Sequence, residues 1–228
     1  MTFSLQWLSH GCWLIEADGV RIVLDPYLTD NPAAKQSADS LDNISHVVVS
    51  HAHFDHTTDV ASIVKRCGAT LVSNFEIAQW FQKHHDIADV VMMNLGGTHT
   101  LPCGTLKMVP AVHSSSFPDG TYGGTPAGYI FTIKDVRVYF ACDTAYFGDM
   151  KFYAQGVNVA VLPIGDVFTM GMGDCIKAIK RIKPKIVLPA HYDTFPPIKA
   201  DVKAWAERVS AETGANPVVL EVGETYLI

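Results

Sequence analysis

Short apolar runs recur along the chain, and most are bounded by glycine, proline, asparagine or aspartate. Runs of this length and setting are typical of β-strands. The first three predicted strands are residues 3–8, 12–17 and 20–24. Asp18-Gly19 separates the second from the third and is a strong hairpin signal, and Asp25-Pro26 ends the third. The chain therefore opens with antiparallel sheet.

Predicted strands and helices alternate after this opening. Asp59 can cap a helix through about Cys67, and Asn74 can cap a second through about His84. Further strands are expected at residues 44–50, 69–73, 89–93, 105–112, 128–133, 136–142, 157–163, 185–190 and 217–222, and further helices at residues 173–182 and 198–213. This order predicts an α/β fold of two mixed sheets packed face to face, with helices outside.

One predicted connection is long for a compact domain. Residues 113–127 are rich in serine, glycine and proline and have no regular hydrophobic period. Ordered loops of this length usually carry function. We expect this loop to border a pocket and to move when a ligand binds.

Composition limits the classes of protein to consider. The 228 residues are 48% hydrophobic and 18% charged, which suits one compact domain over residues 1–228. The net charge of −6 and the scattered distribution of the 17 lysines and arginines argue against a nucleic-acid partner. The N-terminus has no export signal and no apolar stretch suits a membrane span, so a cytoplasmic location is expected. Five widely spaced cysteines predict buried thiols rather than disulfides or a Cys-x-x-Cys site.

The candidate chemistry is concentrated in residues 50–56. His51, His53, Asp55 and His56 directly follow the β-branched run at residues 47–49. Imidazole and carboxylate are ligands that zinc, manganese, iron and nickel accept. His51 and His53 are two positions apart and can reach one ion, while Asp55 and His56 follow a turn and can reach a second. A histidine-rich surface loop is the alternative interpretation.

The same pattern recurs elsewhere in the chain. A side chain able to bind metal follows each of four apolar runs: His51, His113, Asp143 and His191. Strand ends at a shared sheet edge can converge in space. Each residue alone could simply cap a turn, but the four together with the histidine cluster predict one metal centre.

With this pattern the sequence resembles the metallo-β-lactamase superfamily over nearly its whole length. The closer likeness is to bacterial and archaeal metal-dependent hydrolases related to ascorbate-6-phosphate lactonase. The segments that carry it, besides the cluster, are Leu24-Asp25-Pro26, Val112-His113-Ser114-Ser115, Cys142-Asp143-Thr144, Pro163-Ile164-Gly165-Asp166, Phe168-Thr169-Met170-Gly171 and His191-Tyr192-Asp193-Thr194-Phe195-Pro196. The resemblance implies the four-layer αββα metallo-β-lactamase fold.

The resemblance also implies a dinuclear site with two divalent metal ions. One ion would be held by His51, His53 and His113; the other would be held by Asp55, His56 and His191, with Asp143 bridging. Zinc is the first expectation and manganese the alternative. A metal-held hydroxide would attack the substrate. Asp55 would bind metal and would also act as a catalytic residue that orients this hydroxide. The site would carry about +1 net charge and so favour a small anionic ester, lactone or phosphodiester.

Several flanking residues have expected roles. Asp25 matches an aspartate that accepts the second N–H of a ligand imidazole. His10 is expected at the metal centre as an extra ligand or a substrate contact, although Ser9-His10-Gly11 departs from the usual Gly-His-Ser. Cys142 replaces a usual glycine and is expected in the core. Tyr192 and Thr194 could donate to a substrate, but a structural turn there is the favoured interpretation.

Other functions remain open at this stage. An RNA-processing nuclease of the same superfamily would need a basic surface, which this sequence lacks. The di-iron oxygen or nitric-oxide reductases resemble His-x-Glu-x-Asp-His and need flavin, whereas this chain has His53 at the distinguishing position. A non-catalytic metal-binding module usually lacks ligands, and all seven are present here. No membrane partner is expected, and a homo-oligomer is left open.

Overall fold

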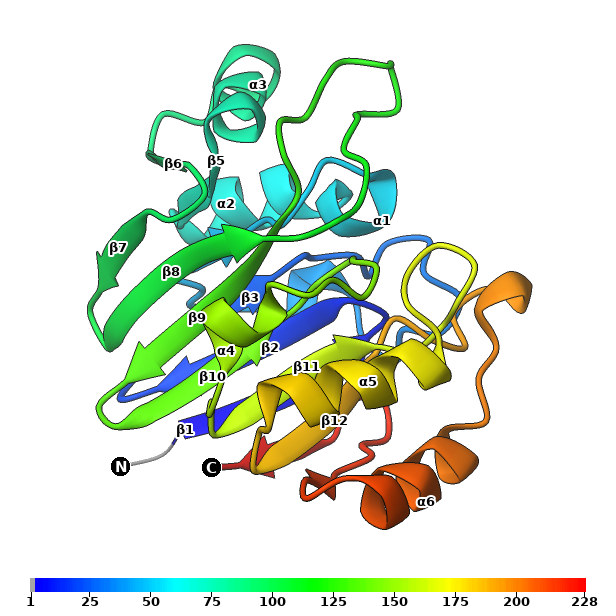
Figure 1. Ribbon diagram of the computed structural model, residues 1–228. Coiled ribbons are helices and arrows are strands. Elements are labelled where there is room, and N and C mark those ends of the chain that lie inside the picture. The colour runs from blue at the N-terminus through cyan, green and yellow to red at the C-terminus, as the bar shows by residue number, and fades with distance from the viewer. Residues whose placement is uncertain (1–2) are drawn as a thin grey trace.

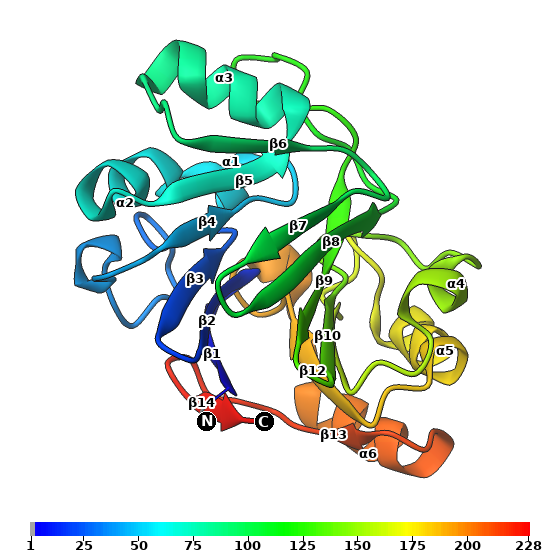
Figure 2. The ribbon, with the colours of Figure 1, turned by 90° about the vertical axis from the view of Figure 1, so that its left-hand side faces the viewer.

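Two seven-stranded sheets pack face to face in the computed structural model, which describes residues 3–228 (Figure 1). Helices cover the outer face of each sheet, as Figure 2 shows. The predicted α/β class and the four-layer αββα order are therefore confirmed.

The first sheet has the order β14-β1-β2-β3-β4-β5-β6. Its strands are β1 (Phe3–Ser9), β2 (Cys12–Ala17), β3 (Val20–Leu24), β4 (His46–Val48), β5 (Thr70–Asn74), β6 (Val90–Met93) and β14 (Thr225–Leu227). β14 and β1 to β3 pair antiparallel, whereas β3 to β6 pair in parallel. Parallel strands end at one edge of a sheet, and this brings Asp25 after β3 close to His51 after β4.

The second sheet has the order β13-β12-β11-β10-β9-β8-β7. Its strands are β7 (Thr98–Leu101), β8 (Gly104–Pro110), β9 (Ala127–Ile133), β10 (Val136–Phe140), β11 (Val159–Pro163), β12 (Ile186–Ala190) and β13 (Asn216–Pro217). β10 to β13 pair in parallel, and the other pairs are antiparallel. Asp143 follows β10 and His191 follows β12, so this sheet also presents polar side chains at one edge.

The helices divide between the two sheets. Those on the side of the first sheet are α1 (Phe54–Thr57), α2 (Val60–Cys67) and α3 (Phe75–His85); those on the side of the second are α4 (Met150–Ala154), α5 (Met172–Ile182) and α6 (Val202–Glu212) (Figure 2). Asn74 caps α3 as predicted, since its side chain accepts from the backbone N–H of Ile77 at 2.9 Å. Asp59 occupies the cap position of α2, but its carboxylate accepts from Leu28 and Thr29 instead.

Aromatic side chains fill the space between the sheets. Trp13 of β2 meets Phe140 of β10 edge to face, with ring centroids 6.0 Å apart, and Phe140 meets Phe131 of β9 at 5.6 Å. All three are buried. Burying a side chain of this size stabilises a fold by about 2–3 kcal/mol, so these aromatic contacts contribute strongly to the packing of the two sheets.

Two expected elements at the C-terminal end are wrong. Residues 217–222 form no full strand: β13 stops at Pro217, and the chain then crosses to the first sheet, where Gly223 N–H donates to the Trp7 carbonyl at 2.7 Å. Val218, Leu220 and Val222 of this stretch pack against the core. The last helix begins at Val202 rather than near residue 198, because Asp201 caps it through the N–H of Ala204.

Four short helices and strands were not predicted: α1, α4, β7 and β14. Each has three to five residues, too few to show a hydrophobic period. All five cysteines are free thiols as predicted, but only Cys12 and Cys175 are buried, and the other three are half-buried. Among residues 3–228, no helix combines the length and the apolar character that a membrane span requires.

Candidate metal centre

The predicted strand ends converge at one edge of the two packed sheets. His51 and His53 follow β4, His113 follows β8, Asp143 follows β10 and His191 follows β12, while Asp55 and His56 lie on α1. Four turn residues around this edge have left-handed backbone: His10 (φ 55°), Asp25 (φ 48°), Cys142 (φ 53°) and His191 (φ 53°). Left-handed backbone is costly for non-glycine residues, and it turns each chain sharply where the strand ends.

Three histidines form the first group. His51, His53 and His113 each offer a ring nitrogen, and these atoms lie within 4.8 Å of one another. His51 Nε2 is 2.9 Å from His53 Nδ1. The structure therefore brings His51 and His53 together, and His113 joins them from the other sheet.

The second group contains one carboxylate and three histidines. Asp55, His56, His191 and His10 offer ligand atoms within 4.8 Å of one another. His56 and His191 stack at a centroid distance of 5.8 Å with 12° between their planes. The structure thus brings together the second predicted set, Asp55, His56 and His191, and adds His10 to it.

Asp143 lies between the two groups. Its Oδ2 atom is 2.9 Å from His191 Nε2 and 3.4 Å from His56 Nε2 in the second group. The same oxygen is 3.6 Å from His113 Nε2 and 3.9 Å from His51 Nε2 in the first group. A single carboxylate oxygen in this position is placed to serve both groups at once.

Asp25 fixes the orientation of His56 from behind. Its Oδ2 atom is 3.0 Å from His56 Nδ1 and accepts from Ser50 Oγ at 2.6 Å, while Oδ1 accepts from the Ser50 N–H at 2.7 Å. Both Asp25 and His56 are buried. The expected role of Asp25, accepting the second N–H of an imidazole, matches this arrangement and leaves His56 Nε2 pointing toward Asp143.

His10 is fully buried and touches the centre through Asp55. Its Nε2 is 3.1 Å from Asp55 Oδ2, and its Nδ1 is 2.9 Å from Thr194 Oγ1. The Ser9-His10-Gly11 turn has φ of 122° at Ser9 and 55° at His10. A Cβ at Gly11 would lie 2.9 Å from His56 Cε1, so only glycine fits there.

The remaining flanking residues have structural contacts. Tyr192 is buried and stacks on Trp7 with centroids 5.1 Å apart. Thr194 contacts His10, as described above, rather than open space. Cys142 packs against the core between the sheets, and its thiol donates to the Phe140 carbonyl at 3.7 Å, as its expected core position required.

Burial and mutual charge shift the pKa values of these groups. Burial and the charge of His191 lower the pKa of His10 to about 4. Burial and the neighbouring His56 hold the pKa of His51 well below its ordinary value. Although burial opposes ionisation of Asp143, the imidazoles of His191 and His56 outweigh it and hold the pKa of that carboxyl well below its ordinary range. His10 and His51 therefore favour the neutral form and Asp143 favours the ionised form, while one other histidine shifts in the opposite direction.

The exception is His56. Burial would lower its pKa, but the carboxylates of Asp143, Asp25 and Asp55 outweigh burial and raise the pKa well above its ordinary value. The negative charge of three carboxylates around one imidazole stabilises a cation at this place. A proton on His56 supplies that cation in the metal-free chain, and a dication could supply it instead.

The donor set fits metal ions. His56 Nε2 and both ring nitrogens of His191 are buried and have no hydrogen-bond partner among the described residues. Orphaned buried nitrogens are costly, and in this case two of them face a carboxylate oxygen across a short gap. Neutral imidazole nitrogens and carboxylate oxygens are the ligands that zinc and manganese take. The residues present therefore suit divalent ions.

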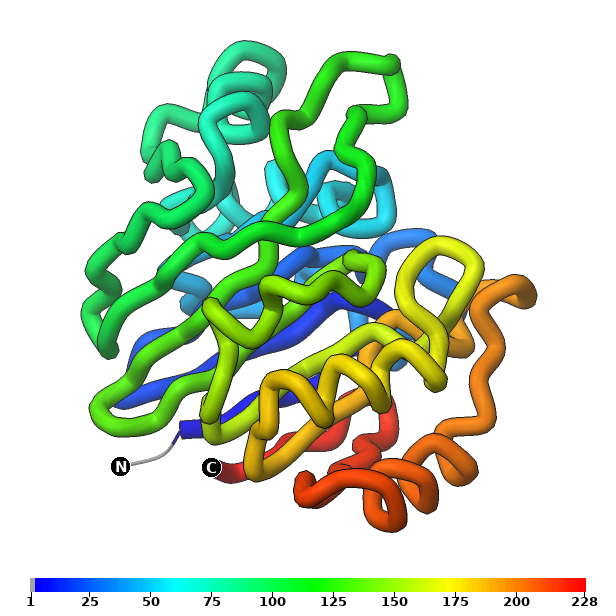
Figure 3. The backbone as a smooth tube through the Cα atoms, in the orientation of Figure 1, coloured from blue at the N-terminus to red at the C-terminus, as the bar shows by residue number. Residues whose placement is uncertain are grey.

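A cavity of about 1020 Å³ opens over the centre. His53, Asp55, His113, Asp143 and His191 line its base. The loop at residues 113–127 borders it, as predicted, through positions 113–120; in Figure 3 this loop rises beside α3. Five large apolar side chains form what we call the apolar walls: Phe54, Phe117, Val167, Phe168 and Phe195.

No function was predicted from the sequence for the residues of the apolar walls. Phe168-Thr169-Met170-Gly171 and His191-Tyr192-Asp193-Thr194-Phe195-Pro196 were recognised only as family segments. A signal was present, because Val167 and Phe168 stand in a polar turn after β11, where an apolar pair has no core to enter. Both are more than half exposed, at 67% and 53%.

Comparison with known proteins gives a family match. Residues 20–192 match the family described as the Beta-lactamase superfamily domain. A protein of Thermus thermophilus named UPF0173 metal-dependent hydrolase is 46% identical over 222 residues, which cover 97% of each chain. A UPF0173 metal-dependent hydrolase of Methanopyrus kandleri is 42% identical over 229 residues, covering 97% of this chain and 98% of the relative.

Solved structures agree. A protein of the archaeon Ignicoccus hospitalis, described as a novel metallo hydrolase, superposes with a TM-score of 0.89 at 34% identity and covers 100% of this chain and 99% of its own. An isothiocyanate hydrolase from Delia radicum gut bacteria has a TM-score of 0.78 at 16% identity, with 98% of each chain covered. At that identity the second likeness concerns the fold alone.

Proposed function

The chain belongs to the UPF0173 metal-dependent hydrolases of the β-lactamase superfamily, and we propose that it hydrolyses a small ester, lactone or phosphodiester with two divalent metal ions. One ion would be held by His51, His53 and His113, and the other by Asp55, His56 and His191, with Asp143 shared. Zinc is the first choice and manganese the second.

The observation that carries this proposal is the position of Asp143. One of its carboxylate oxygens lies within 4 Å of a nitrogen from four histidines that belong to two separate groups. A structural carboxylate needs one or two partners. A carboxylate oxygen shared by two clusters of imidazoles is the arrangement that two cations a few ångströms apart would stabilise.

The protein side chains have distinct roles in this proposal. Bound ions would supply Lewis-acid chemistry and an activated water. Asp55 reaches into the cavity and is placed to orient the attacking water, while His10 holds Asp55 in that direction from a buried position. His10 is therefore a positioning residue, and Thr194 sets its ring in turn. Asp25 holds His56 in the same way.

The expected charge of the loaded centre supports an anion at the reacting group. With two carboxylates against two dications, the centre stays positive even after an attacking hydroxide is counted, at about +1. Hydrolysis of an ester or lactone develops negative charge on oxygen in the transition state and yields an anion. The likeness to ascorbate-6-phosphate lactonase supports a lactonase-type reaction within this class.

Two other functions are less well supported. An RNA-processing nuclease would need cations along the path of the strand, and no lysine or arginine lines the cavity within residues 3–228. A non-catalytic metal-binding module would have no need for a wide cavity over its ions. Small-molecule hydrolysis accounts for both features.

Chelation and reloading test the proposal. Protein purified without chelator should turn over at least one member of a panel of small lactones, esters and phosphodiesters. Turnover should stop with a chelator and return with zinc or manganese. His53→Ala should lose metal and activity while keeping the circular-dichroism spectrum of the wild type. Full-rate turnover by His53→Ala, or by chelated protein, would contradict the proposal.

A further inference from the structure

The polar side chains that line the cavity are those of the metal centre at its base and two serines of the 113–127 loop, Ser114 and Ser116. Above the base, the apolar walls are Phe54, Phe117, Val167, Phe168 and Phe195, supplemented by two prolines. Among residues 3–228, no lysine, arginine or glutamate lines the cavity, and its only aspartates are the two of the metal centre. A charged group far from the reacting atoms would therefore find no side chain of opposite charge on these walls.

The apolar walls are held in place by ring contacts. Phe54 meets Tyr27 edge to face at 5.9 Å, and Phe195 lies 6.3 Å from the same tyrosine. On the other side, Phe117 stacks on Trp80 with centroids 3.8 Å apart. These side chains are consequently pre-organised, and a ligand that touches them has little ordering to impose.

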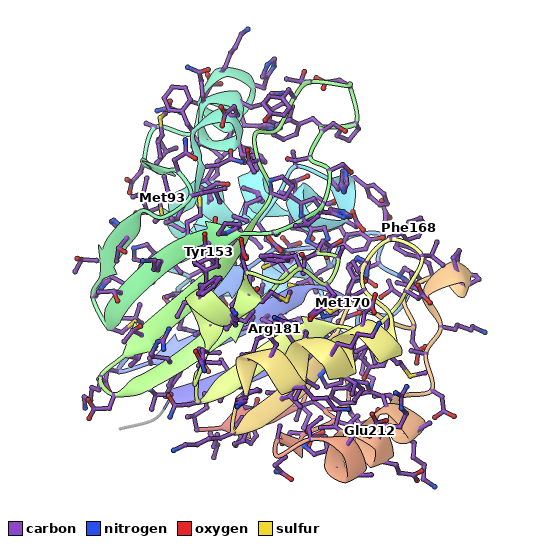
Figure 4. The ribbon with its side chains drawn as sticks, in the orientation of Figure 1. Met93, Tyr153, Phe168, Met170, Arg181 and Glu212 are labelled. Carbon is purple, nitrogen blue, oxygen red and sulfur yellow. The ribbon has the colours of Figure 1, made fainter. Side chains whose placement is uncertain are left out.

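The part of the apolar walls formed by Val167 and Phe168 has a strained backbone. Val167 has φ of 56° directly after Asp166 with φ of 61°, and a β-branched residue rarely adopts left-handed backbone. This turn is on the loop between β11 and α5, and it brings Phe168 to the cavity mouth (Figure 4). Strain of this kind persists where the resulting position is useful. Here it exposes two apolar side chains beside the metal centre.

We propose that the substrate carries an aryl or acyl group that binds the apolar walls, while its scissile ester or lactone is its only polar group and lies at the metal centre. This rests on the proposed function and narrows it to carboxylic esters and lactones of apolar acids or alcohols. A cavity of about 1020 Å³ has room for such a group. If the substrate were a phosphorylated sugar lactone, its phosphate would lie against the phenylalanine side chains of the apolar walls, where no lysine or arginine lines the cavity.

The test compares γ-butyrolactone, γ-octalactone and γ-dodecalactone with zinc-loaded protein. Each methylene that becomes buried should raise kcat/KM roughly fourfold until the walls are covered. Phe168→Ala should lower kcat/KM for γ-dodecalactone by about tenfold, with a smaller loss for each shorter lactone. Phe152→Ala is the matched control, because Phe152 is an exposed phenylalanine on α4 that does not line the cavity; it should behave as the wild type.

A binding measurement separates this inference from the proposed function. Isothermal titration calorimetry with hexanoate and decanoate should show tighter binding of decanoate, and Phe168→Ala should reduce the difference. If no ester, lactone or phosphodiester is hydrolysed but decanoate binding follows this pattern, the proposed function fails and the apolar site stands. If hydrolysis occurs with no dependence on chain length, or a phosphorylated sugar lactone is the better substrate, the inference is overturned alone.

A second copy of the chain is the other candidate occupant of the walls. Sedimentation would reveal it as a wild-type dimer that Phe168→Ala converts to monomer. That result, together with rates independent of chain length, would also overturn the inference.

Discussion

The base of the cavity and its apolar walls differ in how the fold holds them. The base is formed by the ends of strands from both sheets and by α1, and the side chains there are fixed by contacts such as His56 to Asp25 and Asp55 to His10. Four of the five wall residues stand on loops, whereas Phe54 begins α1; Val167 and Phe168 are largely exposed. The base can therefore fix a reaction while the walls are free to vary with the substrate.

This difference predicts that variants in the base affect every substrate, whereas variants in the walls affect only some. It also predicts how the effects rank. Losing a shared ligand should reduce function most, and losing a residue that holds a ligand in place should reduce it less. Changing a residue of the apolar walls should have the smallest effect and can increase the stability of the fold.

The largest effect is expected for Asp143→Ala. The variant removes the one oxygen that both histidine groups share, so turnover of every substrate should fall by roughly a thousandfold or more. Steady-state rates measure the loss of turnover, and elemental analysis of the same preparation measures the loss of bound metal. Asp149→Ala, at an exposed aspartate outside the cavity, is the control. If Asp143→Ala lowered turnover of only some substrates, the base and the apolar walls would not have the separate roles assigned to them.

Asp25→Asn should have the next largest effect. Asparagine tolerates the left-handed backbone of this position, but it presents no charge to His56 Nδ1. Zinc affinity should fall by about 10–100-fold, as measured by competition with a chromophoric chelator. Asp18→Asn makes the same change in a left-handed hairpin position away from the centre and should leave the affinity unchanged. Equal affinity in both variants would remove the assigned role of Asp25.

His10→Asn should change the pH dependence of stability in metal-free protein. Because the pKa of folded His10 is about 4 and its ordinary value is 6.5, the unfolded chain binds more protons between these pH values. Stability from this group is complete above pH 6.5 and is lost as pH falls toward 4, by at most about 3 kcal/mol.

Urea unfolding of the metal-free wild type should therefore show stability falling over this pH range. His10→Asn should show a shallower fall, by up to one proton, because it has no group to titrate there. Identical slopes for the two proteins would mean that His10 is not the neutral, buried histidine of this account.

The smallest effect is expected for Val167→Asn. Asparagine accepts left-handed backbone more readily than valine, so the variant should be more stable by about 1 kcal/mol, which raises Tm by about 2–4 °C. Differential scanning calorimetry measures this. A lower Tm would show that Val167 contributes packing rather than strain, and the apolar walls would then be part of the core and not of the site.

The base of the site was largely predictable from the sequence. Each predicted ligand lies directly after an apolar run or within residues 51–56, and parallel strands that end at one edge must bring such residues together. Asp143 and His191 meet for this reason, whereas His113 follows the antiparallel strand β8 and His51 comes from the other sheet. The fold class followed from the same alternation of strands and helices.

The apolar walls and the C-terminal crossing were not predictable in the same way. Phe117 takes its place from a stack on Trp80, a contact between a loop and a helix that no local pattern encodes. Residues 217–222 carry a strand-like apolar run, but their backbone bridges the two sheets instead of extending one. His10 was placed near the centre, yet its burial behind Asp55 depends on Thr194, far away in the chain.

The central claim is that two ions lie between the strand ends of the two sheets. A crystal structure of zinc-loaded protein, measured at the zinc absorption edge, tests this directly. The account predicts two anomalous peaks, one among His51, His53 and His113 and the other among Asp55, His56 and His191, with Asp143 in contact with both. A single peak, or none at this edge of the sheets after loading with zinc, would contradict it.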